Sequence, residues 1–122
     1  MRIVKAIVVL LAVAVMATAA SVASGDWTGT IRVGDIDLRL ALHITESGKG
    51  LQATFDSIDQ KVFGMPVDKI ELKGQRLKFE LASIQAVYTG TLNKPGTMIT
   101  GEWSQVGMSF PVSFKKATQA KK

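Results

Sequence analysis

The sequence predicts an all-β protein: a single eight-stranded antiparallel meander barrel, lipocalin-like, that follows an N-terminal export signal. From residue 25 onward, apolar and polar residues alternate with a period of two, which is typical of strands with one buried face. Gly, Asn or Pro interrupts this alternation every ~11 residues. The connections are short and sequential, which favours a closed barrel over the alternative, a two-sheet β-sandwich.

The N-terminus has the parts of a cleaved signal peptide, which we assign to residues 1–23. Two basic residues open the chain, residues 6–17 form an uninterrupted apolar run, and small residues follow. The apolar run is 12 residues long, shorter than the ~20 that a transmembrane helix needs. Sites of the A-x-A type end at Ala19 and at Ala23, so we predict cleavage near residues 19–23. We expect a periplasmic or secreted protein whose mature form has no membrane span.

The predicted barrel domain covers residues 25–116, and a Lys-rich flexible tail covers residues 117–122. The formal net charge is +5, but removal of the signal leaves 13 basic residues against 10 acidic ones. Four of those basic residues lie at positions 115–122. A nucleic-acid-binding domain concentrates cations on its folded face, so we expect no nucleic-acid partner.

The first three strands are predicted over 27–33, 36–45 and 51–55. Trp27 begins the inward face of the first strand, where we expect it to form the floor of the barrel. In the second strand five aliphatic residues share one face, whereas His43 lies on the charged face. A long loop over residues 56–66 follows, and the remaining strands are predicted over 70–72, 76–81, 88–92, 99–103 and 108–114.

Three strands share a pattern in which an inward Gly lies between an aromatic and an aliphatic residue: Gly29, Gly90 and Gly101. Glycine inside a strand marks a bend or the close approach of another group. We interpret these glycines as room for large rings in a narrow barrel, with ligand contact as the alternative.

Several segments together resemble one known module: GDWTGT at 25–30, DSIDQ at 56–60 followed by GMPVD at 64–68, YTGTL at 88–92 and TGEWSQ at 100–105. They are similar to the small β-barrel domain that precedes the catalytic domain in many secreted bacterial α/β-hydrolases. The Gly-x-Trp start is also similar to the opening of lipocalin and fatty-acid-binding barrels. The sequence carries no hydrolase domain behind the barrel, so the resemblance implies an accessory, non-catalytic module.

The residues themselves provide no set of catalytic groups. His43 is the only histidine and is expected to be outward and solvated, and there is no Gly-x-Ser-x-Gly elbow. Acids at positions 56, 59 and 68 are spaced too loosely for a calcium loop. The chain has no cysteine for a disulfide or a thiolate–metal site. We therefore predict that the protein is not an enzyme and uses no metal or cofactor.

One end of the predicted barrel collects apolar residues in its turns, whereas the turns of the other end are polar. The candidate binding residues at this end are Ile58, Val62, Phe63, Met65, Ile84, Trp103 and Met108. The 56–66 loop could plug the barrel with Phe63 and Met65, or form a mouth for a small apolar ligand. The alternative is a protein-interaction surface that docks on a secreted hydrolase or another envelope protein.

Overall fold

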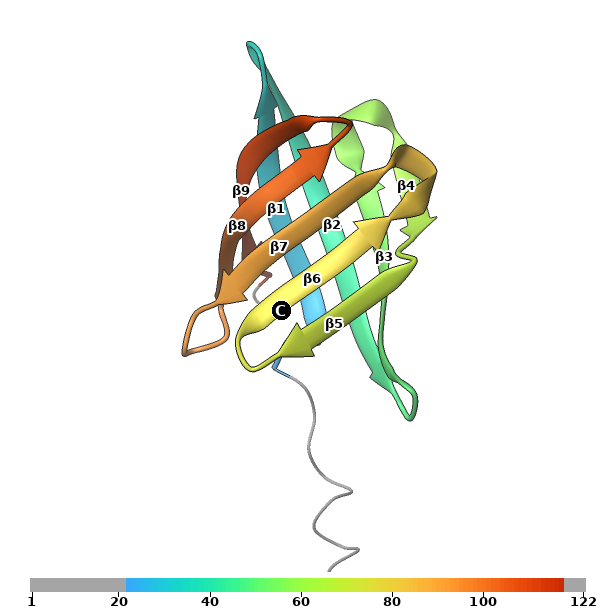
Figure 1. Cartoon of the computed structure of the whole chain (residues 1–122), viewed down its shortest axis with the longest axis vertical. Helices are drawn as coiled ribbons and strands as arrows, with labels where there is room; N and C mark the ends of the chain where they lie inside the picture. Colours follow the sequence, from blue (N-terminus) through green and yellow to red (C-terminus); the bar gives the residue numbers. More distant parts are fainter. Residues whose placement is uncertain (1–21, 118–122) are drawn as a thin grey trace, which may run out of the picture.

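Nine antiparallel strands make up one curled sheet in the computed structural model, which describes residues 22–117 (Figure 1). The strands are β1 (Gly25–Val33), β2 (Ile36–Ser47), β3 (Gly50–Ser57), β4 (Val62–Pro66), β5 (Lys69–Lys73), β6 (Arg76–Leu81), β7 (Ala86–Leu92), β8 (Met98–Gln105) and β9 (Met108–Lys116). Two single-turn 3₁₀ helices, η1 (Ile58–Gln60) and η2 (Ala82–Ile84), form corners between strands. The all-β prediction is confirmed, and there is one sheet rather than the two of a sandwich.

The prediction of eight strands in a closed barrel is wrong. The ninth strand is β4, which lies inside the 56–66 segment that was expected to be a loop and pairs with β3. β4 is only five residues long and contains Gly64 and Pro66, both of which are typical of loops. Its sequence therefore does not show the alternation that revealed the other strands.

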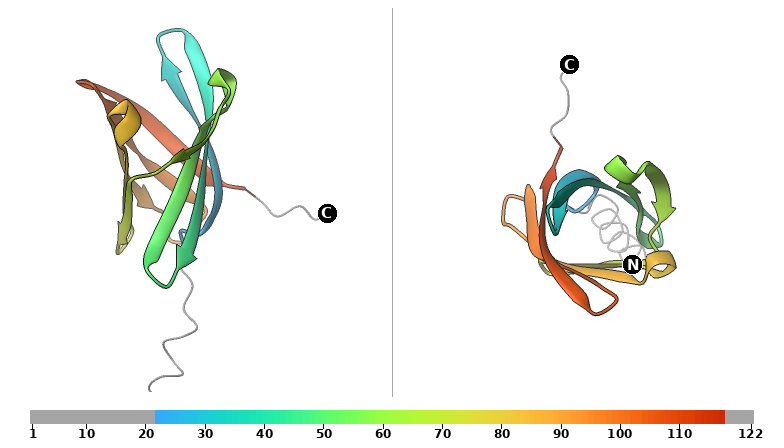
Figure 2. Two further views of the ribbon diagram at one scale, coloured as in Figure 1. Left: turned by 90° about the vertical axis from the view of Figure 1, so that its right-hand side faces the viewer. Right: turned by 90° about the horizontal axis from the view of Figure 1, so that it is seen from above.

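The sheet curls into a barrel, and this barrel is open because its two edge strands, β4 and β5, do not pair with each other. The sheet order is β4-β3-β2-β1-β9-β8-β7-β6-β5, so the first and last strands are neighbours in its middle. The chain crosses the opening at two residues. The Val67 N–H donates to the Ala53 carbonyl of β3 at 3.1 Å, and the Asp68 N–H donates to the Glu80 carbonyl of β6 at 2.9 Å. Figure 2 shows the curl from above.

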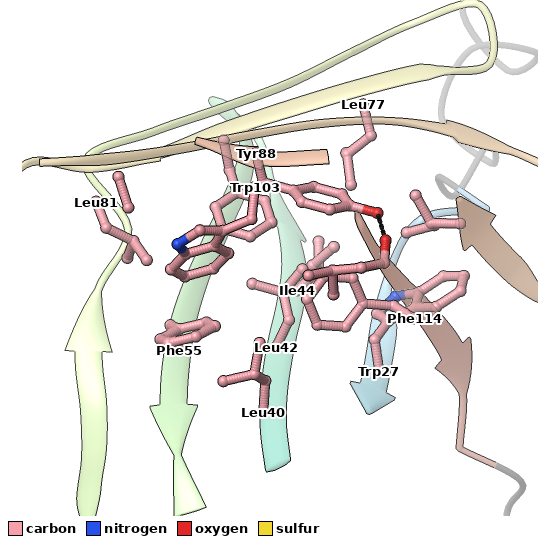
Figure 3. Packing of buried hydrophobic residues seen from close by; sticks show 14 of the residues in the cluster. Trp27, Leu40, Leu42, Ile44, Phe55, Leu77, Leu81, Tyr88, Trp103 and Phe114 are labelled. Atoms are coloured by element: carbon pink, nitrogen blue, oxygen red, sulfur yellow. Dashed lines mark hydrogen bonds between the residues drawn. The ribbon is translucent and has the colours of Figure 1, made fainter. Parts of the chain in front are cut away.

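The middle of the barrel is filled by a chain of aromatic rings from opposite parts of the sheet (Figure 3). Phe55 lies 5.3 Å from Trp103, and Tyr88 lies 5.2 Å from Phe79 and 5.1 Å from Phe114, measured between ring centroids. The Tyr88 hydroxyl donates to the Val112 carbonyl at 2.7 Å, and its burial raises the pKa of the phenol. Phe55, Phe79, Tyr88 and Phe114 are all buried, so these rings form the centre of the core.

The prediction that Trp27 forms the floor is confirmed, since its side chain is fully buried. Its indole N–H donates to the Ala23 carbonyl at 2.9 Å, and the Lys116 ammonium lies 5.4 Å from its ring centroid. Cation–π contact of this kind is favourable. The predicted signal peptide at residues 1–23 lies outside the described residues except for positions 22 and 23, and the tail lies outside them except for position 117.

The strand glycines make room for close packing. Gly90 and Gly101 face each other across β7 and β8. A Cβ on Gly90 would come within 2.9 Å of the Tyr88 ring, and one on Gly101 would come within 2.1 Å of the Thr89 carbonyl oxygen. These contacts favour the packing interpretation over ligand contact.

Candidate ligand-binding site

A half-open apolar pocket of about 690 Å³ lies at one end of the barrel. This mouth end is formed by the β1–β2 turn, η1, η2 and the β8–β9 turn, at the top of Figure 1. The floor end, where Trp27 lies, carries the other turns. Volumes of this order suit small-molecule ligands. The pocket is lined by Ile31, Val33, Leu38, Leu40, Phe55, Ser57, Gln60, Val62, Met65, Ile84, Trp103, Gln105, Val106, Met108 and Phe110.

The structure brings five of the predicted site residues together in this lining: Val62, Met65, Ile84, Trp103 and Met108. Ile58 and Phe63 lie outside the pocket. Phe63 is 64% exposed, so it does not plug the barrel, whereas Met65 packs against the core. The 56–66 segment, which was expected to plug the barrel or to form a mouth for a ligand, contributes one wall of the pocket through Val62 and Met65.

Sequence reasoning missed the wall that β1 and β2 contribute: Ile31, Val33, Leu38 and Leu40. These positions belong to the alternating inward faces, which were expected to be core throughout. They line the pocket because they lie near the mouth end of their strands, beyond the aromatic rings that fill the middle. Their nearness to the β1–β2 turn is the signal that could have identified them.

The polar groups of the pocket wall are hydrogen-bonded within the protein. The Ser57 hydroxyl donates to the Gln60 side-chain oxygen at 2.6 Å. The Trp103 indole donates to the Gln105 side-chain oxygen at 3.0 Å, and the Gln105 amide donates to the Ile84 carbonyl at 2.9 Å. No ionisable side chain belongs to the lining. The interior of the site is therefore apolar and uncharged.

Apolar side chains also stand exposed around the mouth: Val33, Ile36, Val62, Phe63, Val106 and Met108. Among the described residues, Val22 is the one large hydrophobic with comparable exposure elsewhere. Val106 is 72% exposed and Met108 is 58% exposed. Apolar side chains are therefore concentrated on the surface of this end of the barrel.

The mouth end also holds the three described non-glycine residues with positive φ: Lys61, Gln85 and Val106. Lys61 and Gln85 end the two 3₁₀ corners in the left-handed region. Val106, at φ 44°, precedes Gly107 in a two-residue hairpin turn. A β-branched residue rarely adopts this conformation because its branched Cβ clashes with the backbone. Such strain concentrates at functional sites.

Side-chain anchors hold both corners against the sheet. At η1, the Asp59 carboxylate accepts hydrogen bonds from the Arg39 guanidinium at 2.7 Å and from the Arg39 N–H at 2.8 Å. These two bonds lower the pKa of Asp59. At η2, the Asp68 carboxylate accepts from the Ala82 N–H at 2.6 Å. Asp59 and Asp68, which the sequence alone did not assign to a site, therefore hold the two corners that form walls of the pocket.

His43 is outward, as predicted, but it is not a solvated single side chain. Its two ring nitrogens lie 2.8 Å from carboxylate oxygens of Asp26 on β1 and Asp56 on β3. A neutral imidazole has only one N–H, so both contacts are hydrogen bonds only in the protonated ring. The bonds to Asp26 and then to Asp56 raise the pKa of His43. Sequence reasoning missed this cluster because it depends on strand register, which pairs Asp26 with His43.

Asp56 extends the cluster to the edge strand. Its other carboxylate oxygen accepts the Gly64 N–H of β4 at 2.8 Å. Burial alone would raise the pKa of Asp56, but the bonds from Gly64 and His43 outweigh it and lower the pKa. The two carboxylates lie on opposite nitrogens of His43, so the three groups do not converge on one cation. No group of acids and histidine in the described chain is arranged to hold a metal ion.

Residues 22–117 contain no helix that is long and apolar enough to cross a membrane. Comparison with protein-family models, with curated proteins and with solved structures gives no significant match to this chain. The inference of function therefore depends on the geometry of the pocket.

Proposed function

We propose that this protein is an exported, non-catalytic binding module that holds a small apolar ligand in the pocket at its mouth end. The observation that carries the proposal is the pocket itself: about 690 Å³, half open, and lined mostly by apolar side chains. Concave apolar sites of this size with a few placed polar groups are typical of ligand-binding sites. The resemblance to hydrolase-associated and lipocalin-like barrels, and the signal-like N-terminus, support the same proposal.

The energetics of the mouth also support a ligand. Inward aliphatic side chains such as Leu38 remain partly exposed there, and burial of the remaining apolar surface would contribute about 25 cal/mol per Å². The rings of Phe55 and Trp103 form part of the pocket wall but do not fill its volume. A bound apolar molecule would complete the burial that the chain leaves unfinished.

The test is a fluorescence titration with N-phenyl-1-naphthylamine, an uncharged apolar probe. We expect saturable binding with energy transfer from Trp103, which lines the pocket. Met108→Ser removes an exposed pocket residue and should weaken binding several-fold with little change in stability. Phe63→Ser is the matched control, because Phe63 is exposed at the same end but lies outside the pocket. Absence of saturable binding to the wild-type protein would refute the proposal.

A second candidate function is docking on a secreted hydrolase or another envelope protein. It is favoured by Ile36 and Phe63, which are exposed at the mouth end yet do not line the pocket. Ile36→Ser and Phe63→Ser should then abolish complex formation while probe binding is unchanged. Co-purification of tagged wild-type and variant proteins with the hydrolases of the same secreted fraction distinguishes the two functions.

A further inference from the structure

The lining of the pocket offers no counter-charge to a ligand. The part of the wall that is polar consists of Ser57, Gln60, Trp103 and Gln105, and these groups are hydrogen-bonded to one another or to the backbone. Burying a carboxylate or an ammonium against such a wall costs its hydration and returns no ion pair. The cost falls on the charged form of a ligand and not on its neutral form.

Cations near the mouth do not change this situation. The Arg39 guanidinium is held by Asp59 at 2.7 Å, and Arg32 lies 3.2 Å from Asp37. Neither arginine lines the pocket, and neither does Lys61, which follows η1. A ligand anion would have to compete with Asp37 for Arg32, or with Asp59 for Arg39.

One polar group of the wall can bind the head group of a ligand. The Gln60 side chain is exposed at the mouth, and its oxygen accepts the Ser57 hydroxyl. Within residues 22–117 its amide nitrogen has no hydrogen-bond partner, so it can donate to an oxygen of the ligand head group, and the discrimination against a carboxylate comes from the cost of its lost hydration.

Building on the proposed function, we propose that the pocket selects uncharged ligands with an apolar chain and a hydroxyl, ester or amide head, and rejects fatty-acid anions with the same chain. Net charge works in the opposite direction, because the mature chain keeps 13 basic residues against 10 acidic ones and attracts anions at long range. A preference for the neutral molecule would therefore come from the pocket and not from the field of the whole protein.

The experiment compares 1-dodecanol with dodecanoate as competitors of N-phenyl-1-naphthylamine at neutral pH, below the critical micelle concentration. The two molecules differ only in the head group. We expect dodecanol to compete at a concentration about tenfold or more below that of dodecanoate. Acidification toward the pKa of the fatty acid should reduce this difference, because the neutral acid then enters the pocket. Equal competition at neutral pH would overturn the selectivity but leave the proposed function standing, whereas failure of the probe itself to bind would overturn the proposed function.

A matched pair of variants locates the effect. Met108→Lys places a cation on the pocket lining at an exposed position, and Phe63→Lys adds the same charge at the same end outside the pocket. Met108→Lys should shift the preference toward dodecanoate several-fold, and Phe63→Lys should not. An equal shift in both variants would mean that net charge sets the selectivity, which would overturn the inference.

Discussion

The two tryptophans lie at opposite ends of the barrel and in different surroundings. Trp27, at the floor end, is fully buried beneath Lys116 and bonded to the Ala23 carbonyl. Trp103 is almost as buried, yet one side of it lines the pocket. The floor end is closed by side chains and by both ends of the described chain, whereas the mouth end keeps apolar surface exposed. From this comparison we expect mutations at the floor end to affect stability most, and mutations at the mouth end to affect the proposed binding most.

The largest expected effect tests the floor. Trp27→Ala should lower the free energy of unfolding by about 3–5 kcal/mol, because it leaves a cavity in a filled core. Met108→Ala at the mouth should change it by less than about 0.5 kcal/mol, since most of this side chain is already in water. Urea unfolding monitored by the remaining Trp103 or by circular dichroism measures both. Equal losses of unfolding free energy in the two variants would contradict the expected difference between the two ends.

The next prediction concerns where the floor begins. Ala23 is 1% exposed and accepts the Trp27 indole, and the Lys116 ammonium donates to the Val22 carbonyl at 3.0 Å. Cleavage after Ala23 would remove these groups, whereas cleavage after Ala19 would keep them. We therefore predict a mature protein that begins at position 20, which intact-mass spectrometry of the exported protein will show.

A matched protein that begins at Ser24 measures what the two residues contribute. It should be less stable by about 1–2 kcal/mol, because the buried indole N–H loses its acceptor. An exported protein that begins at Ser24 and is equally stable would contradict this role for Ala23.

Alternation in the sequence was sufficient to predict the sheet, the inward faces and the end at which apolar residues collect. It could not predict burial along a face. Ile36 and Leu42 share one face of β2 and look alike in sequence, yet Ile36 is 61% exposed and Leu42 is fully buried. The difference arises from the curl of the sheet, which depends on pairing between distant strands. The same dependence hid the contacts of His43, whereas β4 was missed because its five residues include Gly64 and Pro66 and do not alternate.

A smaller effect separates strain from binding at the mouth. Val106 and Gly107 both have positive φ, as in a type I′ turn, where Asn-Gly is preferred. Val106→Asn should raise the free energy of unfolding by about 1 kcal/mol through relief of this strain, while weakening probe binding. Val33→Asn is the control: it also removes an exposed valine of the pocket, but from a strand, so it should weaken binding without stabilising the fold. If Val106→Asn stabilises the protein and leaves binding intact, the strained turn has no role in the site.

The smallest effect is the pH dependence of the His43 cluster, which joins β1, β2, β3 and the edge strand β4. Folding raises the pKa of His43 through Asp26 and then Asp56, so the folded protein binds this proton more tightly than the unfolded chain does. The resulting stabilisation is fully present below the ordinary histidine pKa of about 6.5 and is lost as the pH rises through the higher folded-state value. Asp56 has the opposite dependence: its folded-state pKa is lowered, so its contribution is present above its ordinary pKa and is lost in acid.

We therefore expect the melting temperature of the wild-type protein to be higher at about pH 6 than at about pH 9. The difference should be modest, since His43 is 40% exposed and solvent screens the pairs. His43→Gln keeps one hydrogen bond but cannot titrate, so it should remove most of this difference between the two pH values. A wild-type protein with equal melting temperatures at the two pH values would show that the carboxylates do not hold the protonated ring. The same variants test a link to the pocket, because the bond from the Gly64 N–H to Asp56 anchors the β4 wall. If probe binding weakens at the higher pH in the wild type and not in His43→Gln, the cluster also sets the position of β4.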